Sequence, residues 1–127
     1  MKNGWIGVDL DGTLAEYHGW ESEEHIGEPI PPMLARVKAW LAAGIEVRIF
    51  TARVDGGESA AAVGNPNAEK FRDVERVKGF IERWCEKHIG QKLPITNRKD
   101  YGMVELWDDR AVQVRPNTGE PVDPTRA

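Results

Sequence analysis

The stretch "IGVDLDGTL" at residues 6–14 decides the fold, because it places two carboxylates at the end of an apolar strand. Ile6 and Val8 favour a β-strand, and side chains alternate between the two faces of a strand. Asp9 and Asp11 are therefore predicted to share one face. Two carboxylates on one face repel each other and resist burial, so the rest of the chain must supply a compensating charge.

The composition is that of an ordinary globular protein. The chain has 127 residues, of which 40% are hydrophobic and 30% charged, enough for one domain with a core. Its net charge of −4 offers no global basic surface for nucleic acid, although a local basic groove stays open. A single cysteine, Cys85, excludes an internal disulfide. The amino-terminal residues become acidic too early for a signal peptide, and no run is long enough to span a bilayer. We therefore expect a cytoplasmic protein without a membrane partner.

Apolar periodicity predicts strands that alternate with helices along residues 1–127, as a single domain. Residues 15–32 and 54–64 lack a period and are predicted loops, the second of them mobile. Gly44 stands where a helix-ending glycine belongs, and Asn65 or Asn67 caps the second helix. The predicted strands are 5–10, 45–53, 93–96 and one or two within 103–114; the predicted helices are 33–43 and 65–90; the core spans about 4–114, and 115–127 form a turn and a loose tail.

This alternation predicts an α/β domain with a mainly parallel sheet. Right-handed crossovers bring the carboxyl ends of the strands to one edge, where ligands bind in open α/β sheets. Polar residues that are far apart in sequence follow these strands. They are Asp9, Asp11, Thr51, Arg53, Asp108 and Asp109.

At these positions the sequence resembles the haloacid dehalogenase-like (HAD) hydrolase superfamily. The resemblance is carried by "DLDGTL" at 9–14, "IFTAR" at 49–53, a later lysine and "LWDD" at 106–109. It covers the chain from Trp5 to about Val114. It implies a Rossmann-like three-layer sandwich and a Mg²⁺-dependent phosphatase that works through an aspartyl-phosphate.

The residues fit that chemistry. A carboxylate nucleophile splits a slow hydrolysis into two easier steps, so Asp9 would attack phosphorus. Asp11 would protonate the leaving oxygen and later deprotonate the attacking water. Gly12 allows the sharp turn, and Thr13 would fix it through its hydroxyl. Four acids in one crevice need a hard divalent cation as counter-ion. The resemblance implies that Mg²⁺ is held by the Asp9 carboxylate, the Asp11 carbonyl and the Asp108 carboxylate, with Asp109 acting through water.

The remaining expected site residues would bind the substrate phosphate or neutralise it. Thr51 and Ala52 would contact phosphoryl oxygens, Thr13 lies beside them, and Arg53 would bind phosphate or pair with an acid. A lysine would pair with Asp9 and phosphate. Lys99 is the first choice and Lys92 the alternative, because only about ten residues separate Lys99 from the acidic pair and leave little room for a helix.

No loop is long enough to form a folded cap domain, so the resemblance implies the capless type. An uncovered site suits a bulky substrate end or closure by a second subunit in a homo-oligomer. Residues 51–53 and the charged helix after them resemble the phosphatase half of polynucleotide kinase-phosphatases, whereas the acidic charge argues against nucleic acid and leaves small phosphate esters open. His18, His25 and Trp20 could contact substrate or lie on the surface. A non-catalytic metal- and phosphate-binding module is the alternative function.

Overall fold

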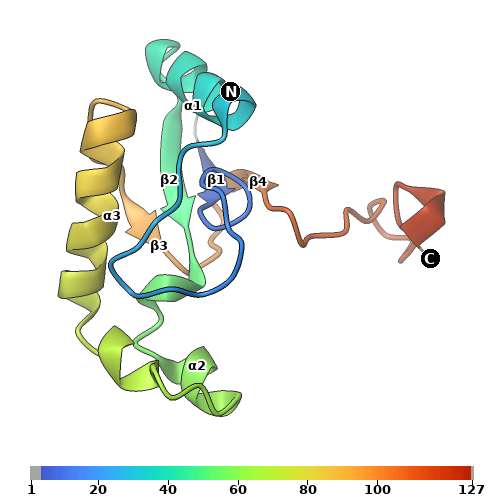
Figure 1. Cartoon of the computed structure of the whole chain (residues 1–127). Helices are drawn as coiled ribbons and strands as arrows, with labels where there is room; N and C mark the ends of the chain where they lie inside the picture. Colours follow the sequence, from blue (N-terminus) through green and yellow to red (C-terminus); the bar gives the residue numbers. More distant parts are fainter. Residues whose placement is uncertain (1–3, 127) are drawn as a thin grey trace.

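Four parallel strands form the centre of the protein, in the order β3-β2-β1-β4 (Figure 1). The structure is a computed structural model that describes residues 4–126, so residues 1–3 and 127 of the predicted domain lie outside it. The strands are β1 (Trp5–Asp9), β2 (Glu46–Phe50), β3 (Ile95–Thr96) and β4 (Met103–Trp107). The helices are α1 (Pro31–Ala42), α2 (Glu58–Ala62) and α3 (Val74–His88), with short 3₁₀ turns at Ala52–Val54, Ala68–Phe71 and Pro124–Arg126.

β1 is the central strand of the functional half of the sheet. It pairs in parallel with β2 on one side and with β4 on the other, so that Val8 lies opposite both Ile49 and Trp107. β3 pairs in parallel with β2. The predicted α/β class and parallel sheet are therefore confirmed, and the carboxyl ends of β1, β2 and β4 meet at one edge.

Helices α1 and α3 cover the same face of this sheet. Both crossovers, from β1 to β2 and from β2 to β3, step in one direction along the sheet, and right-handed connections then fall on one side. The core unites apolar residues of both helices with alternate residues of the strands. Its central members are Ile6, Val8, Val47 and Ile49 from the sheet, Met33 and Val37 from α1, and Val77, Ile81 and Cys85 from α3.

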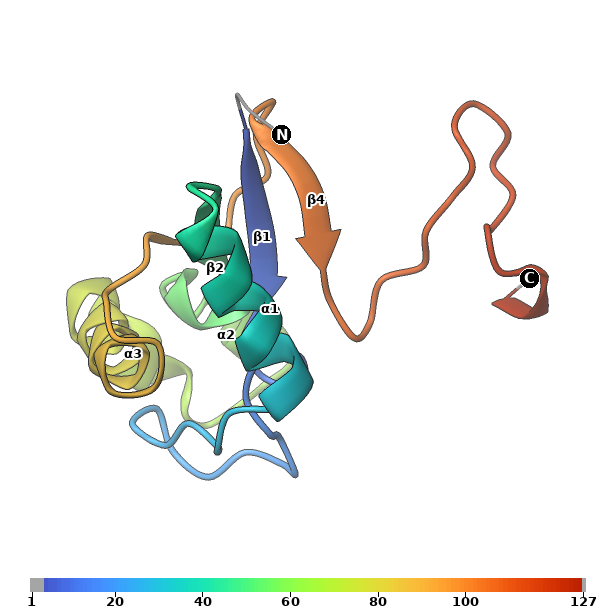
Figure 2. The same ribbon diagram turned by 90° about the horizontal axis from the view of Figure 1, so that it is seen from above.

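The opposite face carries no helix in residues 4–126 (Figure 2). Only residues 97–102 join β3 to β4, and they cross this face as an irregular link. Trp5 marks the crossing, because its Nε1 donates to Asp100 Oδ1 at 2.9 Å and its ring lies under the Arg48 guanidinium at 4.4 Å. The described chain therefore has a helix layer on one face, where the resemblance implied one on each.

Helix boundaries depend on local capping. Gly44 adopts φ +80° directly after α1, so the predicted glycine stop is confirmed. The second helix was predicted to begin at residue 65, which is wrong: α3 begins at Val74, because the Asp73 side chain accepts the Arg76 backbone N–H at 3.1 Å and caps the first turn. The prediction of a loop over 54–64 is also wrong where Glu58–Ala62 form α2.

The chain after Trp107 forms no further strand within the described residues. Val114 and Pro121 make a single antiparallel bridge, which closes a turn in the predicted tail. Among the helices described here, none combines the length and the apolar character that a bilayer crossing requires.

Candidate functional site

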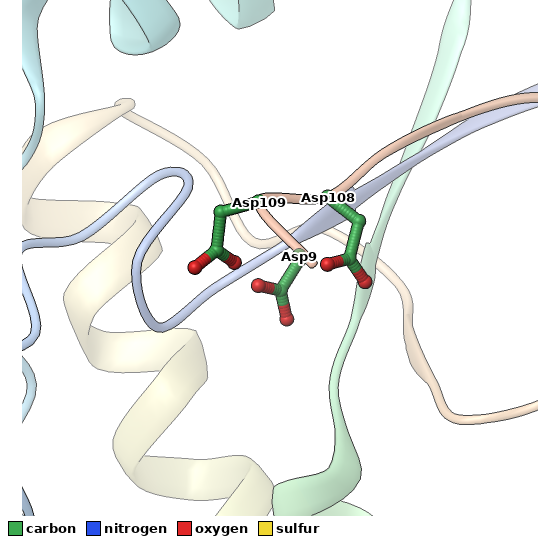
Figure 3. Close-up of side chains that lie close together, drawn as sticks. All are labelled: Asp9, Asp108 and Asp109. Atoms are coloured by element: carbon green, nitrogen blue, oxygen red, sulfur yellow. The ribbon is translucent and has the colours of Figure 1, made fainter. Parts of the chain in front are cut away.

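Three carboxylates converge at the carboxyl edge of the sheet (Figure 3). Asp9 ends β1, and Asp108 and Asp109 directly follow β4, its neighbour in the sheet. One oxygen from each carboxylate lies within 4.8 Å of the others. These residues were predicted as a group from their strand-end positions, and the structure brings all three together.

A tight turn after β1 holds this cluster in place. Gly12 has φ +92°, and a Cβ there would lie 2.6 Å from Asp109 Oδ2, so only glycine fits the turn and the approaching carboxylate. The Thr13 hydroxyl lies 3.2 Å from Asp9 Oδ2 and 3.1 Å from Asp109 Oδ1, and it accepts the Asp109 backbone N–H at 2.9 Å. Thr13 therefore ties the end of β1 to the end of β4.

The cluster raises the pKa of Asp9 to about 7, far above the ordinary value of 3.8. Burial is the largest cause, followed by a hydrogen bond with Asp109 and by repulsion from the Asp108 and Asp109 charges. The bond from Thr13 acts in the opposite direction and lowers the pKa. The three acids therefore lack a positive charge close enough to offset their mutual repulsion.

Asp11 does not share this environment. Its carboxylate pairs with Arg53, which donates from Nε to Oδ2 at 2.7 Å and from Nη2 to Oδ1 at 2.8 Å. The predicted crevice of four free acids is therefore wrong in one member, since β1 ends at Asp9 and the turn carries the Asp11 side chain toward Arg53. The Asp11 backbone remains beside the cluster at the start of the turn.

Arg53 also anchors the first loop, which we define as residues 16–28. Its Nη2 donates to the His25 carbonyl at 2.9 Å and its Nη1 to the Glu23 carbonyl at 3.3 Å. The guanidinium lies 5.4 Å from the centre of the Trp20 ring, and Trp20 in turn packs on Phe71 at 5.0 Å. Arg53 is 7% exposed, so this arginine is a buried junction between Asp11 and the loop.

A cavity opens between the cluster and Arg53. Thr51 is buried at its wall and its hydroxyl oxygen accepts the Arg53 backbone N–H at 3.2 Å, which leaves the hydroxyl hydrogen free to donate into the cavity. The predicted residues Thr51, Ala52 and Arg53 thus all border one space with the acids. The lining residues are Asp9, Asp11, Tyr17, Trp20, Phe50, Thr51, Ala52, Arg53, Asp108 and Arg110.

Neither predicted lysine belongs to this lining. Lys99 is exposed in the link between β3 and β4, and Lys92 is exposed before β3, at the opposite end of that strand from the site. The cations that border the cavity are Arg53 and Arg110. The short link explains the position of Lys99, because it cannot form the helix that would return a lysine to the cluster.

The other uncertain residues of the first loop have defined positions. His18 and His25 are exposed, with Nε2 3.3 Å from Glu16 and 3.0 Å from Glu21 respectively. Both border a second cavity beside the first, between this loop and Arg53. Residues 54–65 border neither cavity.

Sequence reasoning missed three contributors to the site region. Arg110 was predicted to be structural, yet it borders the cavity and its backbone N–H donates to Asp108 Oδ1 at 2.7 Å. Tyr17 was not singled out, and it borders both cavities. Glu23 stands in an acidic run typical of a solvated surface, but it is 7% exposed and pairs with Arg76 at 3.2 Å. Only a contact 53 residues along the chain buries it, so no local signal could have identified it.

Comparisons of this chain with protein-family models, curated proteins and solved structures gave no match.

Proposed function

We propose that the protein is a Mg²⁺-dependent phosphomonoester hydrolase of the small, capless HAD type, which acts through an aspartyl-phosphate on Asp9. The observation that carries the proposal is the convergence of Asp9, Asp108 and Asp109 beside a cavity that also presents Thr51. Acids supply a nucleophile and metal ligands, and the hydroxyl supplies a phosphate donor. These are the groups that phosphoryl transfer requires.

The donor set fits a hard divalent cation. Three carboxylates offer oxygen ligands only, and their repulsion already raises the pKa of Asp9 to about 7. Mg²⁺ prefers oxygen ligands and keeps several waters, which suits a site with few protein ligands. Asp9, Asp108 and the Asp11 carbonyl would hold it, with Asp109 behind them. The ion would neutralise charge on the phosphoryl oxygens.

The chain's own residues divide the remaining work. The free oxygen of Asp9 attacks phosphorus and forms the phosphoryl ester, while the substrate's ester oxygen leaves. Thr51 donates its hydroxyl hydrogen to a phosphoryl oxygen. Arg110 and Arg53 supply positive charge at the cavity wall, where the resemblance implied a lysine.

Asp11 is the proposed acid and base, and Arg53 controls it. Both oxygens of Asp11 accept hydrogen bonds from Arg53, so Asp11 can serve the leaving group only when Arg53 releases one of them. An incoming phosphate offers Arg53 a second anionic partner. We therefore assign both predicted roles to Arg53: it pairs with an acid when the site is free, and it turns toward phosphate when substrate is bound.

A non-catalytic metal- and phosphate-binding module is the second candidate. It is favoured by the absence of any lysine from the cavity lining within residues 4–126 and by the engagement of Asp11 with Arg53. Such a module would keep Mg²⁺ and phosphate affinity without turnover.

The substrate class follows from the open cavity. No folded cap covers it, so both a small phosphate ester and the phosphorylated end of a macromolecule fit the proposal. Trp20 and Tyr17 border the cavity and offer rings for a nucleotide base, which keeps nucleotide and polynucleotide ends in the test panel. A reduced, buried Cys85 agrees with a cytoplasmic location, which we propose on that ground.

Phosphate release tests the two candidates directly. Purified full-length protein is incubated with an aryl phosphate, a sugar phosphate, a nucleoside monophosphate and a 3′- or 5′-phosphorylated oligonucleotide, with Mg²⁺ or with EDTA. A phosphatase releases phosphate with Mg²⁺ and stops in EDTA. The binding module instead binds inorganic phosphate by calorimetry only when Mg²⁺ is present, and it releases none from any ester.

A further inference from the structure

The carboxyl-terminal segment leaves the body of the protein directly after the site. Residues 111–125, which we call the arm, project away from the sheet in both views (Figures 1 and 2). Within the described part of the chain, their hydrogen bonds join residues of the arm to one another, such as Arg115 N–H to the Glu120 carbonyl and Val122 N–H to the Gln113 carbonyl, both at 2.8 Å. The arm thus receives no hydrogen-bond support from its own body.

The arm nevertheless has a defined, partly apolar structure. Val114 and Pro121 form an antiparallel bridge, and the Thr118 hydroxyl donates to the Arg115 carbonyl at 3.0 Å. Val112, Val114 and Val122 are 44%, 49% and 37% exposed. Ordering about fifteen residues costs conformational entropy that these few bonds do not offset. An apolar surface elsewhere must therefore stabilise the arm.

The same chain carries an apolar surface that its own helices leave uncovered. We call it the open face: Phe50, Met103 and Leu106 on the side of the sheet opposite α1 and α3. All three are half-buried and lie outside the main core and its packed neighbours. A Cβ on Gly7 would lie 3.3 Å from both Leu106 Cδ1 and Met103 Sδ, which places these side chains together over the middle of β1.

We propose that the arm of one copy packs across the open face of a second copy, and that the second copy returns its own arm, to form a two-fold dimer. Both halves of the contact exist once in every chain, which is the condition for a closed, self-complementary pair. The arm's first limb, 111–116, can extend ~20 Å and so matches the ~17 Å length of five-residue β4. Valines on the arm would meet aliphatic and aromatic side chains on the open face.

This exchange also brings the second copy to the border of the candidate site. Phe50 belongs to the open face and to the lining of the cavity beside Asp9. The arm follows Arg110, which borders that cavity in its own chain. Each cavity would therefore lie next to chain from both copies.

Sedimentation equilibrium on full-length protein tests the dimer. The arm variant is V114D/V122D, and the matched control is V63D, which adds the same charge to a valine that is 81% exposed outside the arm. Wild type and V63D should be dimers. The arm variant should be a monomer with unchanged circular dichroism, with a dimer dissociation constant raised about a hundredfold or more, because two arms are lost at once. A monomeric wild type, or an arm variant that dimerises like wild type, would overturn the proposal.

A mixing experiment tests the exchange itself. The face variant L106K, or M103K if L106K does not fold, should be monomeric because its surface rejects the arm. Face variant and arm variant together should form a mixed dimer through the one remaining arm and face. A mixture that stays monomeric at concentrations where wild type is fully dimeric shows that the arm and the open face do not bind each other.

Discussion

Arg53 holds both carboxylate oxygens of Asp11, at 2.7 and 2.8 Å, while its remaining N–H groups hold the carbonyls of the first loop. One buried guanidinium thus fixes the turn after β1 and the loop that borders the cavity. The pair joins residues 42 positions apart in sequence, and it determines which charges face the site.

Arg53→Ala should destabilise the protein, because it leaves Asp11 and the two loop carbonyls without their partner. Removing one member of a buried ion pair typically costs about 3 kcal/mol of unfolding free energy. The matched control is Arg72→Ala, whose pair with Glu69 is 73% exposed on both sides and should cost less than about 0.5 kcal/mol. Urea denaturation measures both values, and equal losses for the two variants would contradict the role given to Arg53.

Arg53→Lys should separate binding from chemistry in the proposed reaction. A lysine keeps the charge but cannot hold Asp11 and phosphate with a planar fork. We expect a higher KM for the phosphate ester and a smaller decrease in kcat, both measured by phosphate release. Unchanged KM would show that Arg53 does not contact the substrate phosphate.

The stability of the metal-free protein should fall as the pH rises from about 4 to about 7. Asp9 has a pKa of about 7 in the folded protein against 3.8 as its ordinary value, so in this range the folded state binds the additional proton. Raising the pH removes that proton from the folded state at a cost, and the effect levels off above pH 7. Thermal unfolding in EDTA should show this fall for wild type, and Asp9→Asn should flatten it. A fall of the same size in Asp9→Asn would assign it to other groups.

Thr13→Val should raise the pKa of Asp9 above about 7, because the Thr13 hydroxyl is the contact that lowers it. Thr13→Ser keeps the hydroxyl and serves as the matched control. Carboxyl ¹³C chemical shifts followed against pH in the metal-free protein measure the pKa directly. A lower or unchanged pKa in Thr13→Val would show that the hydrogen bond does not stabilise the charged form.

Mg²⁺ should stabilise the wild type through the acid cluster. A ligand at one hundred times its Kd adds about 2.7 kcal/mol to the unfolding free energy. Asp108→Asn should lose most of the shift, whereas Asp123→Asn, which alters an exposed acid in the arm, should keep it. Equal Mg²⁺ shifts in the two variants would place the metal elsewhere.

Strand positions and the acid cluster could be predicted from sequence because both depend on local pattern. Ile6 and Val8 alternate with residues of the other face, and the carboxyl ends of parallel strands meet at one edge, so Asp9 was bound to approach Asp108. Gly44 likewise marked a helix end through its backbone freedom alone. These features require no knowledge of distant contacts.

The environments of individual charges could not be predicted in the same way. Asp11 turns away from Asp9 because Arg53 captures it, and Glu23 is buried because Arg76 reaches it from α3. The late start of α3 followed from the cap at Asp73, which competes with earlier Asn residues of equal propensity. The open face was foreshadowed only by the shortness of the link after β3.

The most direct test of the central claim is phosphate release by Asp9→Asn beside wild type, with Mg²⁺ and the best ester of the panel. Circular dichroism must first show that both proteins are equally folded. If Asp9 is the nucleophile, the variant should lose on the order of 10⁴-fold in kcat, as expected when the attacking group of a covalent mechanism is removed. A variant that keeps its rate within tenfold of wild type would show that phosphoryl transfer does not pass through Asp9.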